Sequence, residues 1–189
     1  VRGLHNLREG HRGCVVTIGN YDGVHRGHQH MLASVSEHAR RLFLPTTVVT
    51  FEPTPREFFE GAAAPSRLMR LREKVEALPL YGVDRVVVLR FDRQMQGMGA
   101  AEFVDRLLVA GLGARHVVVG HDFRFAKRRE GTLATLSEAG AKHGFGVQEI
   151  GEFLVEGERV SSSLVREALG RGDLARAEKL LGRPYRMAG

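Results

Sequence analysis

The stretch CVVTIGNYDGVHRGH, residues 14–28, combines a fold signal with a chemical one. Its first five residues form an apolar run of β-formers, and a helical repeat of apolar residues follows the second histidine. A strand that passes through glycines into a helix is typical of a parallel α/β sheet. We expect Gly19, Gly23 and Gly27 to allow positive φ and to let a ligand approach the backbone closely.

Short runs rich in β-branched residues alternate with helical patterns along the rest of the chain. The further strands are predicted at 46–51, 84–89, 116–119 and 146–150, and the helical patterns at 67–78, 100–110 and 132–143. Strands that are apolar on both faces and alternate with helices predict a parallel sheet covered on both sides. The expected fold is therefore a doubly wound, Rossmann-like α/β domain, which binds ligands at the carboxyl ends of its strands.

Two regions depart from this alternation. Residues 51–66 are rich in proline and small residues and are predicted to form a long loop. From about 161 to 189 the pattern is helical only, and Asp173 is the expected N-cap of the second of two short helices. We expect one domain over residues 1–189, with this small helical segment at its C-terminal end.

The composition favours anionic small molecules as partners. Lysine and arginine number 28 against 22 acidic residues, a net charge of +6, which attracts nucleotides and nucleic acids alike. Aromatic residues make up 7% and do not alternate with basic residues as base-stacking platforms would, so we expect no nucleic-acid partner. No apolar run approaches the roughly 20 residues that span a bilayer. Together with a single cysteine, this predicts a cytoplasmic protein without a membrane partner.

The two histidines of the opening stretch are expected beside the start of a helix, near Gly27 or His28. Free N–H groups and the helix dipole make such a position a ready site for phosphate, and His25 and His28 can add donors. Ordinary surface histidines are the alternative, because the chain has 9 histidines. A zinc site lacks the support of a cysteine pair or an HExxH motif.

HRGH after a glycine-rich strand end is the HxGH signature of the nucleotidylyltransferases. Five further segments occur in order: TFEPTPREFF, LREKVEAL, GVDRVVVLRFD, VVVGHDFRF and RVSSSLVREAL, the last followed by LLGRPY. Together they resemble, over the whole chain, the FMN adenylyltransferase (FAD synthetase) domain of bacterial bifunctional riboflavin kinase/FMN adenylyltransferases. The resemblance implies a nucleotidylyltransferase-type fold, ATP and FMN as substrates, Mg²⁺ as the metal, and FAD and pyrophosphate as products.

In that family a riboflavin kinase domain follows the adenylyltransferase domain. Its glycine-rich stretch and PTAN-like motif do not occur in these 189 residues. We therefore expect the chain to correspond to the adenylyltransferase half, with a covalently linked kinase domain as its partner in the full-length protein.

The resemblance also implies roles for individual residues. His25 and His28 would hold the α- and β-phosphate oxygens of ATP, and Arg166 would reach the leaving pyrophosphate. The residues expected to bind ATP are Gly19, Asn20, Asp22, Gly27, Asp122, Arg159, Ser162 and Ser163. Those expected to line the flavin are Pro53, Pro55, Phe59, Phe103 and Phe125. Mg²⁺ would be held mainly by substrate phosphates and water.

Each of these roles has a structural alternative. The serines can be simple N-caps and Arg166 a solvated helix charge, and each phenylalanine can belong to the core. Asp122 can be an ordinary turn-forming aspartate.

The stretch FRFAKRREG, 123–131, departs from the family pattern. Ala126 and Arg128 stand where the family usually has glycines, so this loop is expected to be stiffer and more basic. We predict that it covers the substrate phosphates, with Arg129 the member that makes contact. A solvated loop without a role in binding is the alternative.

The sequence leaves two other functions open. Other HxGH nucleotidylyltransferases use different phosphorylated acceptors, although they lack the proline–phenylalanine loop and the GHDFRF turn. A basic flavin- or nucleotide-binding module without catalysis, in contact with RNA, is the second alternative.

Overall fold

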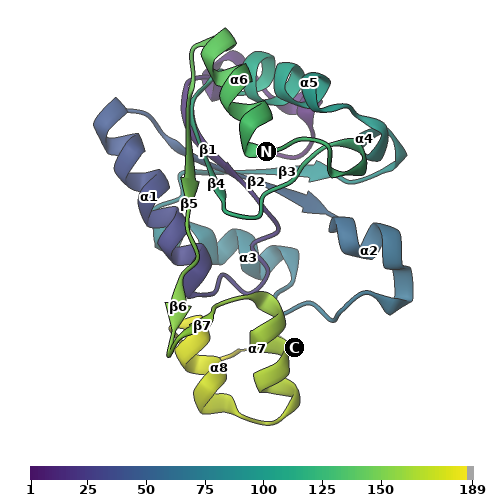
Figure 1. Cartoon of the computed structure of the whole chain (residues 1–189), viewed down its shortest axis with the longest axis vertical. Helices are drawn as coiled ribbons and strands as arrows, with labels where there is room; N and C mark the ends of the chain where they lie inside the picture. Colours follow the sequence, from purple (N-terminus) through teal and green to yellow (C-terminus); the bar gives the residue numbers. More distant parts are fainter. Residues whose placement is uncertain (187–189) are drawn as a thin grey trace.

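The computed structural model describes residues 1–186 and contains a five-stranded parallel sheet between two layers of helices (Figure 1). The strands are β1 (Cys14–Ile18), β2 (Thr46–Glu52), β3 (Arg85–Arg90), β4 (Ala114–Gly120) and β5 (Gly146–Ile150). Their order in the sheet is β3-β2-β1-β4-β5, and all four pairings are parallel. The order reverses between β1 and β4, so the doubly wound α/β prediction is confirmed.

Helices cover both faces of this sheet, because its strands are apolar on both sides. The helices are α1 (Arg26–Leu42), α3 (Leu71–Ala77), α4 (Arg93–Gly97), α5 (Ala100–Phe103), which continues into a π-helix (Val104–Gly111), and α6 (Leu133–His143). Val15 and Val118 pack against α1, whereas Val16 and Val117 pack in the cluster that includes the π-helix and α6. The alternation along β1 and β4 thus divides the core into two halves.

The prediction of a long loop over 51–66 is wrong. Strand β2 extends to Glu52, and helix α2 (Pro55–Glu60) follows. Thr54 is the N-cap of α2 and exchanges hydrogen bonds with Glu57, whose carboxylate accepts the Thr54 N–H at 2.8 Å. Pro55 occupies the first turn, where its missing N–H costs nothing. A capping box followed by a proline at the first helical position therefore starts a helix within a proline-rich stretch.

The predicted helix 67–78 begins four residues later, at Leu71. The preceding segment bends at Leu68 and Met69, where both amides donate to the Asp22 carboxylate and not to a helix carbonyl. Pro79, expected to end the helix, lies inside a 3₁₀ turn, Leu78–Tyr81. The other predicted strands and helices agree with the structure to within two residues at each end.

Two helices, α7 (Ser162–Gly170) and α8 (Leu174–Leu181), form the C-terminal segment below the sheet in Figure 1. They pack around a small core of their own that includes Leu68, Val165 and Leu180. Asp173 caps α8 as predicted, accepting the Arg176 N–H at 2.9 Å. A short hairpin of β6 (Leu154–Val155) and β7 (Glu158–Arg159) precedes them and was not expected. Residues 187–189 of the predicted segment lie outside the described residues.

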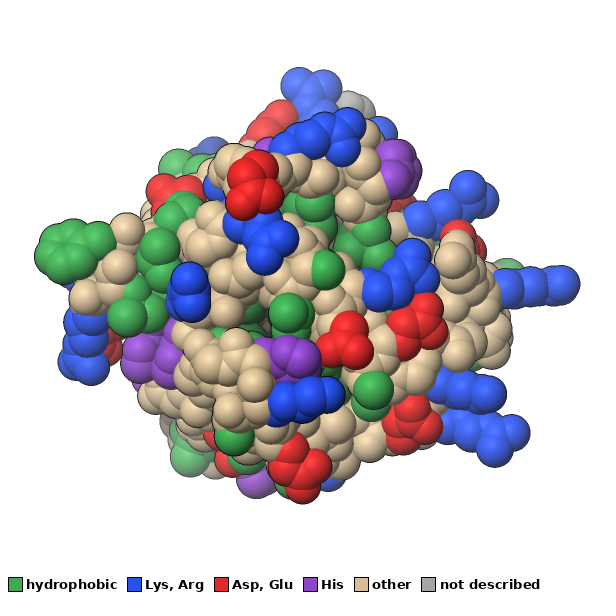
Figure 2. All heavy atoms as spheres, turned by 90° about the horizontal axis from the view of Figure 1, so that it is seen from above, with side chains coloured by type: hydrophobic (Ala, Val, Ile, Leu, Met, Phe, Trp, Pro, Cys, Tyr) green, Lys and Arg blue, Asp and Glu red, His purple; other side chains and the backbone are tan. Residues whose placement is uncertain are grey.

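The surface seen from the end opposite α7 and α8 carries charges of both signs (Figure 2). Lysine and arginine side chains project around the rim, with acidic side chains among them, and this face has no continuous basic patch. Within residues 1–186, no helix has both the length and the apolar character needed to cross a bilayer.

Candidate active site

The loop that joins β1 to α1 is buried and tightly constrained. Of its three glycines only Gly23 has a positive φ, 82°, so the expectation for Gly19 and Gly27 is wrong. Tyr21 and Val24 instead have positive φ, at 50° and 40°, which is uncommon for any side chain and strained for a β-branched one. Gly19 and Gly27 instead lie where neighbouring atoms leave little room for a side chain. A Cβ on Gly27 would lie 3.3 Å from the Val160 carbonyl oxygen.

Several contacts stabilise this strained loop. The Tyr21 hydroxyl lies 2.7 Å from Thr17 Oγ1, and both Tyr21 and Val24 are fully buried. Arg183 donates to the Gly23 carbonyl oxygen at 2.7 Å and to that of Val24 at 3.2 Å. Because residues 23 and 183 are 160 positions apart in the sequence, no local pattern indicated this contact.

His25 is the N-cap of α1, which begins at Arg26, one residue ahead of Gly27 in the predicted helix start. Its Nδ1 accepts the His28 N–H at 3.4 Å, which leaves Nε2 as the protonated nitrogen of the neutral ring and a donor for a ligand. The rings of His25 and His28 stack with centroids 3.6 Å apart. The sequence thus places one imidazole as a helix cap and the second on its first turn, as the HRGH spacing predicted.

Burial and nearby positive charges favour the neutral form of both imidazoles. His25 is only 6% exposed, and burial, followed by the charges of Arg159, Arg166 and Arg183, lowers its pKa to about 4. Burial, then His25 and Lys74, lowers the pKa of His28 well below its usual value. The Nδ1 atom of His28 is buried without a hydrogen-bond partner among the described residues. Neutral rings can donate one hydrogen bond each and gain a proton as anionic phosphate approaches.

The N-terminus of α7 meets the N-terminus of α1. Ser161 caps α7 by accepting the Leu164 N–H at 3.2 Å, so Ser162 and Ser163 are not the caps. Ser162 Oγ donates to the Asp22 carbonyl oxygen at 2.9 Å, and Ser163 is exposed. Two helix N-termini directed at one place concentrate free N–H groups and positive dipole ends, which favours anion binding.

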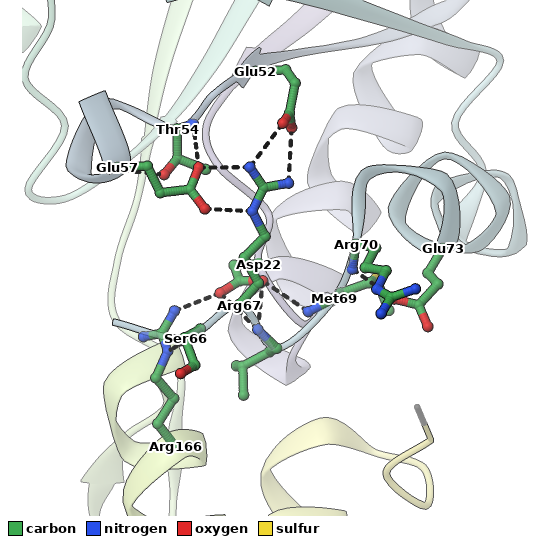
Figure 3. A network of polar contacts seen from close by, with 11 residues as sticks. Asp22, Glu52, Thr54, Glu57, Ser66, Arg67, Met69, Arg70, Glu73 and Arg166 are labelled. Atoms are coloured by element: carbon green, nitrogen blue, oxygen red, sulfur yellow. Dashed lines mark hydrogen bonds and ion pairs between the residues drawn. The ribbon is translucent and has the colours of Figure 1, made fainter. Parts of the chain in front are cut away.

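Asp22 connects this junction to the segment before α3 (Figure 3). Its carboxylate accepts the N–H groups of Leu68 and Met69 at 3.0 and 3.1 Å, and the Arg166 guanidinium at 2.5 Å. Arg166 also donates to the Ser66 carbonyl oxygen at 2.6 Å. Asp22 was predicted to bind ATP. In the structure its carboxylate accepts hydrogen bonds from the two backbone amides and from Arg166, and it thereby orients the Arg166 guanidinium.

Next to these residues lies a cavity of about 150 Å³. Of the predicted site residues, those that line it are Asn20, Asp22, Ser162, Ser163 and Arg166. His25 and His28 do not line it. A larger hollow of about 410 Å³ lies between α3 and residues 183–186; Gly23 lines it, but none of the residues predicted to be catalytic or to bind ATP or flavin does.

Arg67 closes the other side of this cavity and was not predicted from the sequence. Its guanidinium donates to Glu52 at 2.8 Å and to Glu57 at 2.7 Å, linking the end of β2 to α2 (Figure 3). These bonds lower the pKa of Glu57 to about 2. The capping box of Thr54 and Glu57 was the one local signal for this arrangement.

Two predicted ATP-binding residues bond to each other across the site. Arg159 on β7 donates to Asp122, which follows β4, at 2.8 Å, and lies 3.3 Å from Glu152. Arg159 and Arg129 lower the pKa of Asp122. Both partners of the ion pair are exposed, so a nucleotide can exchange for it at little cost.

The predicted flavin-lining residues fall into two groups. Pro53 and Pro55 flank the start of α2, and Phe59 on α2 is 60% exposed, with its ring 5.3 Å from that of Phe58. Phe103 and Phe125 lie in the core, 2% and 6% exposed, with their rings 5.2 Å apart. The surface group can face a ligand directly, whereas the core group lies behind the surface.

The basic loop after β4 is exposed and has three non-glycine residues with positive φ. Ala126, Arg128 and Arg129 have φ of 65°, 53° and 59°. The first two are the positions at which the resemblance implies glycine, and their backbone has a glycine-type conformation with other side chains. Lys127 N–H donates to the Met98 carbonyl oxygen at 2.9 Å, which ties the loop to the region before α5.

A parallel sheet with reversed strand order, an HRGH pair at the first helix and a second helix N-terminus opposite define a nucleotidyltransferase. Comparison of the sequence with known protein families identifies the particular family. Residues 7–164 match the FAD synthetase family, and the chain belongs to it.

Similar proteins agree with this assignment. The chain is 53% identical over 189 residues to a bifunctional riboflavin kinase/FMN adenylyltransferase of Pseudomonas fluorescens, and 46% over 190 residues to that of Escherichia coli K12. All of this chain is aligned, and it spans 60% and 61% of the length of these two relatives. A solved structure from Streptococcus pneumoniae, titled a macrolide-efflux protein, matches with a TM-score of 0.84 at 26% identity, over 98% of this chain and 70% of that one.

Proposed function

We propose that this chain transfers AMP from ATP to FMN and forms FAD and pyrophosphate. The observation that carries the proposal is the meeting of two helix N-termini, where Ser162 donates to the Asp22 backbone at 2.9 Å beside the stacked pair of His25 and His28. Family membership narrows the phosphorylated acceptor to FMN.

The attacking group is a phosphate oxygen of FMN. It is already anionic at neutral pH, so the reaction needs no strong general base. The oxygen attacks the α-phosphorus of ATP in line, the bond to the β-phosphate oxygen breaks, and pyrophosphate leaves with the electron pair. The protein's task is to position the two anions and to stabilise the charge that develops.

The residues divide this task between them. His25 Nε2 and the ring of His28 donate to phosphate oxygens of the transferred group, and Arg166 stabilises the leaving pyrophosphate. Arg166 is already oriented by Asp22 and by the Ser66 carbonyl oxygen. Ser162, Ser163 and the first N–H groups of α7 complete the triphosphate site.

Mg²⁺ is proposed as a companion of the triphosphate. No group of three or more metal-ligating side chains converges within residues 1–186. The carboxylates beside the cavity, Asp22, Glu52 and Glu57, are bonded to N–H groups and arginines. When bound, Mg²⁺ neutralises phosphate charge, and the structure fits a metal held by phosphate oxygens and water.

The flavin is proposed to lie against α2, where Phe59 is exposed beside Pro53 and Pro55. Phe103 and Phe125 would support this surface from the core. Arg129, close enough to Asp122 to lower its pKa, is the residue of the basic loop proposed to reach a substrate phosphate. The cytoplasmic location also stays a prediction.

Two assays test the proposal. The chain, FMN, ATP and Mg²⁺ are incubated and separated by liquid chromatography, and pyrophosphate is measured in parallel. We expect FAD and pyrophosphate in equal amounts. Product from another phosphorylated acceptor but not from FMN would favour a different HxGH nucleotidylyltransferase. Binding of FMN, ATP or RNA without pyrophosphate release would favour a non-catalytic module.

The second activity in the relatives' names is riboflavin kinase. The kinase signature does not occur in residues 1–189. We expect this chain to form no FMN from riboflavin and ATP, and to depend on a kinase domain for its FMN. Detection of FMN in that incubation would contradict the division of labour.

A further inference from the structure

The stretch LLGRPY, residues 180–185, contributes to the family resemblance and lies at the end of α8. Its arginine, Arg183, donates hydrogen bonds to three backbone carbonyl oxygens. Two of them belong to Gly23 and Val24, at 2.7 and 3.2 Å, and the third belongs to Leu181, at 3.2 Å. Arg183 therefore connects the end of α8 to the two residues directly before His25.

A second side chain, Gln29 on α1, bonds to two of the same carbonyl oxygens. Its amide nitrogen donates to that of Val24 at 2.9 Å and to that of Leu181 at 2.7 Å. We call Arg183, Gln29 and the carbonyl groups of Gly23, Val24 and Leu181 the Arg183 clamp. The clamp holds the loop before His25, the start of α1 and the end of α8 together; α8 lies below the start of α1 in Figure 1.

The glycine before Arg183 allows this close approach. Gly182 ends α8 in the left-handed conformation, with φ of 72°, which favours glycine. A Cβ at this position would also lie 3.2 Å from the Gln29 side-chain oxygen and 3.3 Å from Cγ of Arg26. The Gly-Arg pair of LLGRPY thus turns the chain at the end of α8 and brings the guanidinium to the loop before His25.

The loop before His25 depends on contacts of this kind. Residues 23–25 are buried, and a buried carbonyl group that loses its hydrogen-bond partner is costly. Val24 has a φ of 40°, a strained backbone that persists only where the surrounding structure holds it. His25 follows directly, caps α1 and stacks on His28. The position of this loop therefore sets the orientation of both imidazoles.

We propose that Arg183 is a positioning residue for the transfer reaction: it holds the carbonyl groups before His25 so that the HRGH pair keeps the orientation that phosphate contact requires. This inference rests on the proposed function and adds a residue that acts through the two imidazoles. The imidazoles are proposed to stabilise charge that develops in the transition state. Loss of the clamp is therefore expected to lower kcat more than it raises KM.

The kinetic test compares Arg183→Met with Arg171→Met. Arg171 is exposed at the end of α7 and pairs with Glu167, so its substitution removes the same charge from the same helical segment at little cost. We expect Arg183→Met to lower kcat by a factor of about ten or more, because small misplacements of reacting groups are costly. Both KM values should change less than about threefold, and Arg171→Met should match the wild type.

Two further variants separate geometry from charge. Gln29→Met removes donors of the clamp and keeps every charge, so it should lower kcat in the same direction. Arg183→Lys keeps the charge but not the planar fork that reaches several carbonyl groups at once. We expect its kcat to lie between those of Arg183→Met and the wild type.

Nitrogen NMR of the imidazoles at neutral pH reads the position of His25 without turnover. In the wild type Nδ1 of His25 accepts the His28 N–H, so the proton should sit on Nε2. We expect both tautomers to be populated in Arg183→Met and in Gln29→Met, and one in Arg171→Met.

Several results would overturn the proposal. They are a folded Arg183→Met with the kcat of the wild type, a higher KM with kcat intact, and a lower kcat with unchanged His25 signals. If Arg183→Met does not fold, Arg183→Lys is judged by the same two readouts. If neither variant folds, Arg183 belongs to the stability of the segment and the proposal fails.

The two readouts also separate this inference from the proposed function. If the wild type makes no FAD, the proposed function fails, while the His25 signals still show whether the clamp orients the imidazole. If FAD forms and kcat is insensitive to Arg183, only the role of Arg183 fails.

Discussion

Two loops of this protein have side chains at backbone angles that favour glycine, and they differ in how the structure stabilises them. Tyr21 and Val24, in the loop after β1, are fully buried. In the loop after β4, Ala126 is half-buried and Arg128 is exposed. Packing can hold a strained backbone at a functional site, and exposed residues have little packing to offer.

The comparison assigns the two loops different tasks. The buried loop holds the HRGH pair at the N-terminus of α1, and phosphoryl transfer demands precise positioning of the groups that contact phosphate. The exposed loop carries positive charge near Asp122. We therefore expect changes in the first loop to affect chemistry and stability, and changes in the second to affect affinity only modestly.

The largest effect is expected for His28→Ala. Loss of one donor to the developing phosphate charge costs roughly 3 to 4 kcal/mol, a factor of about 10² to 10³ in kcat. The matched control is His30→Ala, an exposed histidine two residues further along α1. A folded His28→Ala variant with the turnover of the control would remove this histidine from the mechanism.

The next effect concerns stability and pH. The pKa of His25 is about 4 in the folded protein and about 6.5 when unfolded. Above pH 6.5 both states are neutral and the full stability is present. As pH falls from 6.5 to about 4, only the unfolded state takes up the proton, so the free energy of unfolding drops by about 3 kcal/mol.

Urea titrations across this pH range measure the effect. His25→Asn, which can still cap α1, should make the pH dependence shallower without abolishing it, because the pKa of His28 is lowered as well; His30→Ala should keep it in full. An equally steep dependence in His25→Asn would show that other groups cause it.

Val24→Gly probes the buried loop directly. Glycine relieves the positive φ, but the fully buried side chain is lost. We expect the packing loss to dominate and the free energy of unfolding to fall by about 1 to 2 kcal/mol. A more stable variant in thermal unfolding would mean that strain outweighs packing here, against the comparison.

The smallest effect is expected for Ala126→Gly/Arg128→Gly. Both residues have positive φ, so glycine should leave stability unchanged or raise it by less than about 1 kcal/mol. Loss of one exposed charge should raise KM for ATP about twofold at low salt and less at physiological salt, where screening acts over about 8 Å. A KM unchanged at every salt concentration would show that the loop is only solvated.

The sequence predicted most of the fold because its strands are short β-branched runs separated by regular helical patterns. It did not predict α2, because the proline-rich composition outweighed the capping box of Thr54 and Glu57. Nor did it show that Tyr21 and Val24, rather than Gly19 and Gly27, adopt positive φ, since that depends on burial and on Arg183.

The predicted site residues were found by motif, and the contacts among them are long-range. Asp22 bonds to Leu68 and Arg166, 46 and 144 positions away. No local spacing reveals such a contact, so the orientation of Arg166 by Asp22 was not predicted, and ATP binding by Asp22 stays a prediction.

The most direct test of the central claim follows the α-phosphorus of ATP. The chain is incubated with Mg²⁺ and ATP labelled at the α-phosphate, together with FMN, nicotinamide mononucleotide or phosphopantetheine, and the products are separated. We expect label to enter FAD in the FMN reaction, with one pyrophosphate released per FAD, and to enter no product with the other acceptors. Label that stays in ATP in the presence of FMN, or that enters another acceptor instead, would contradict it.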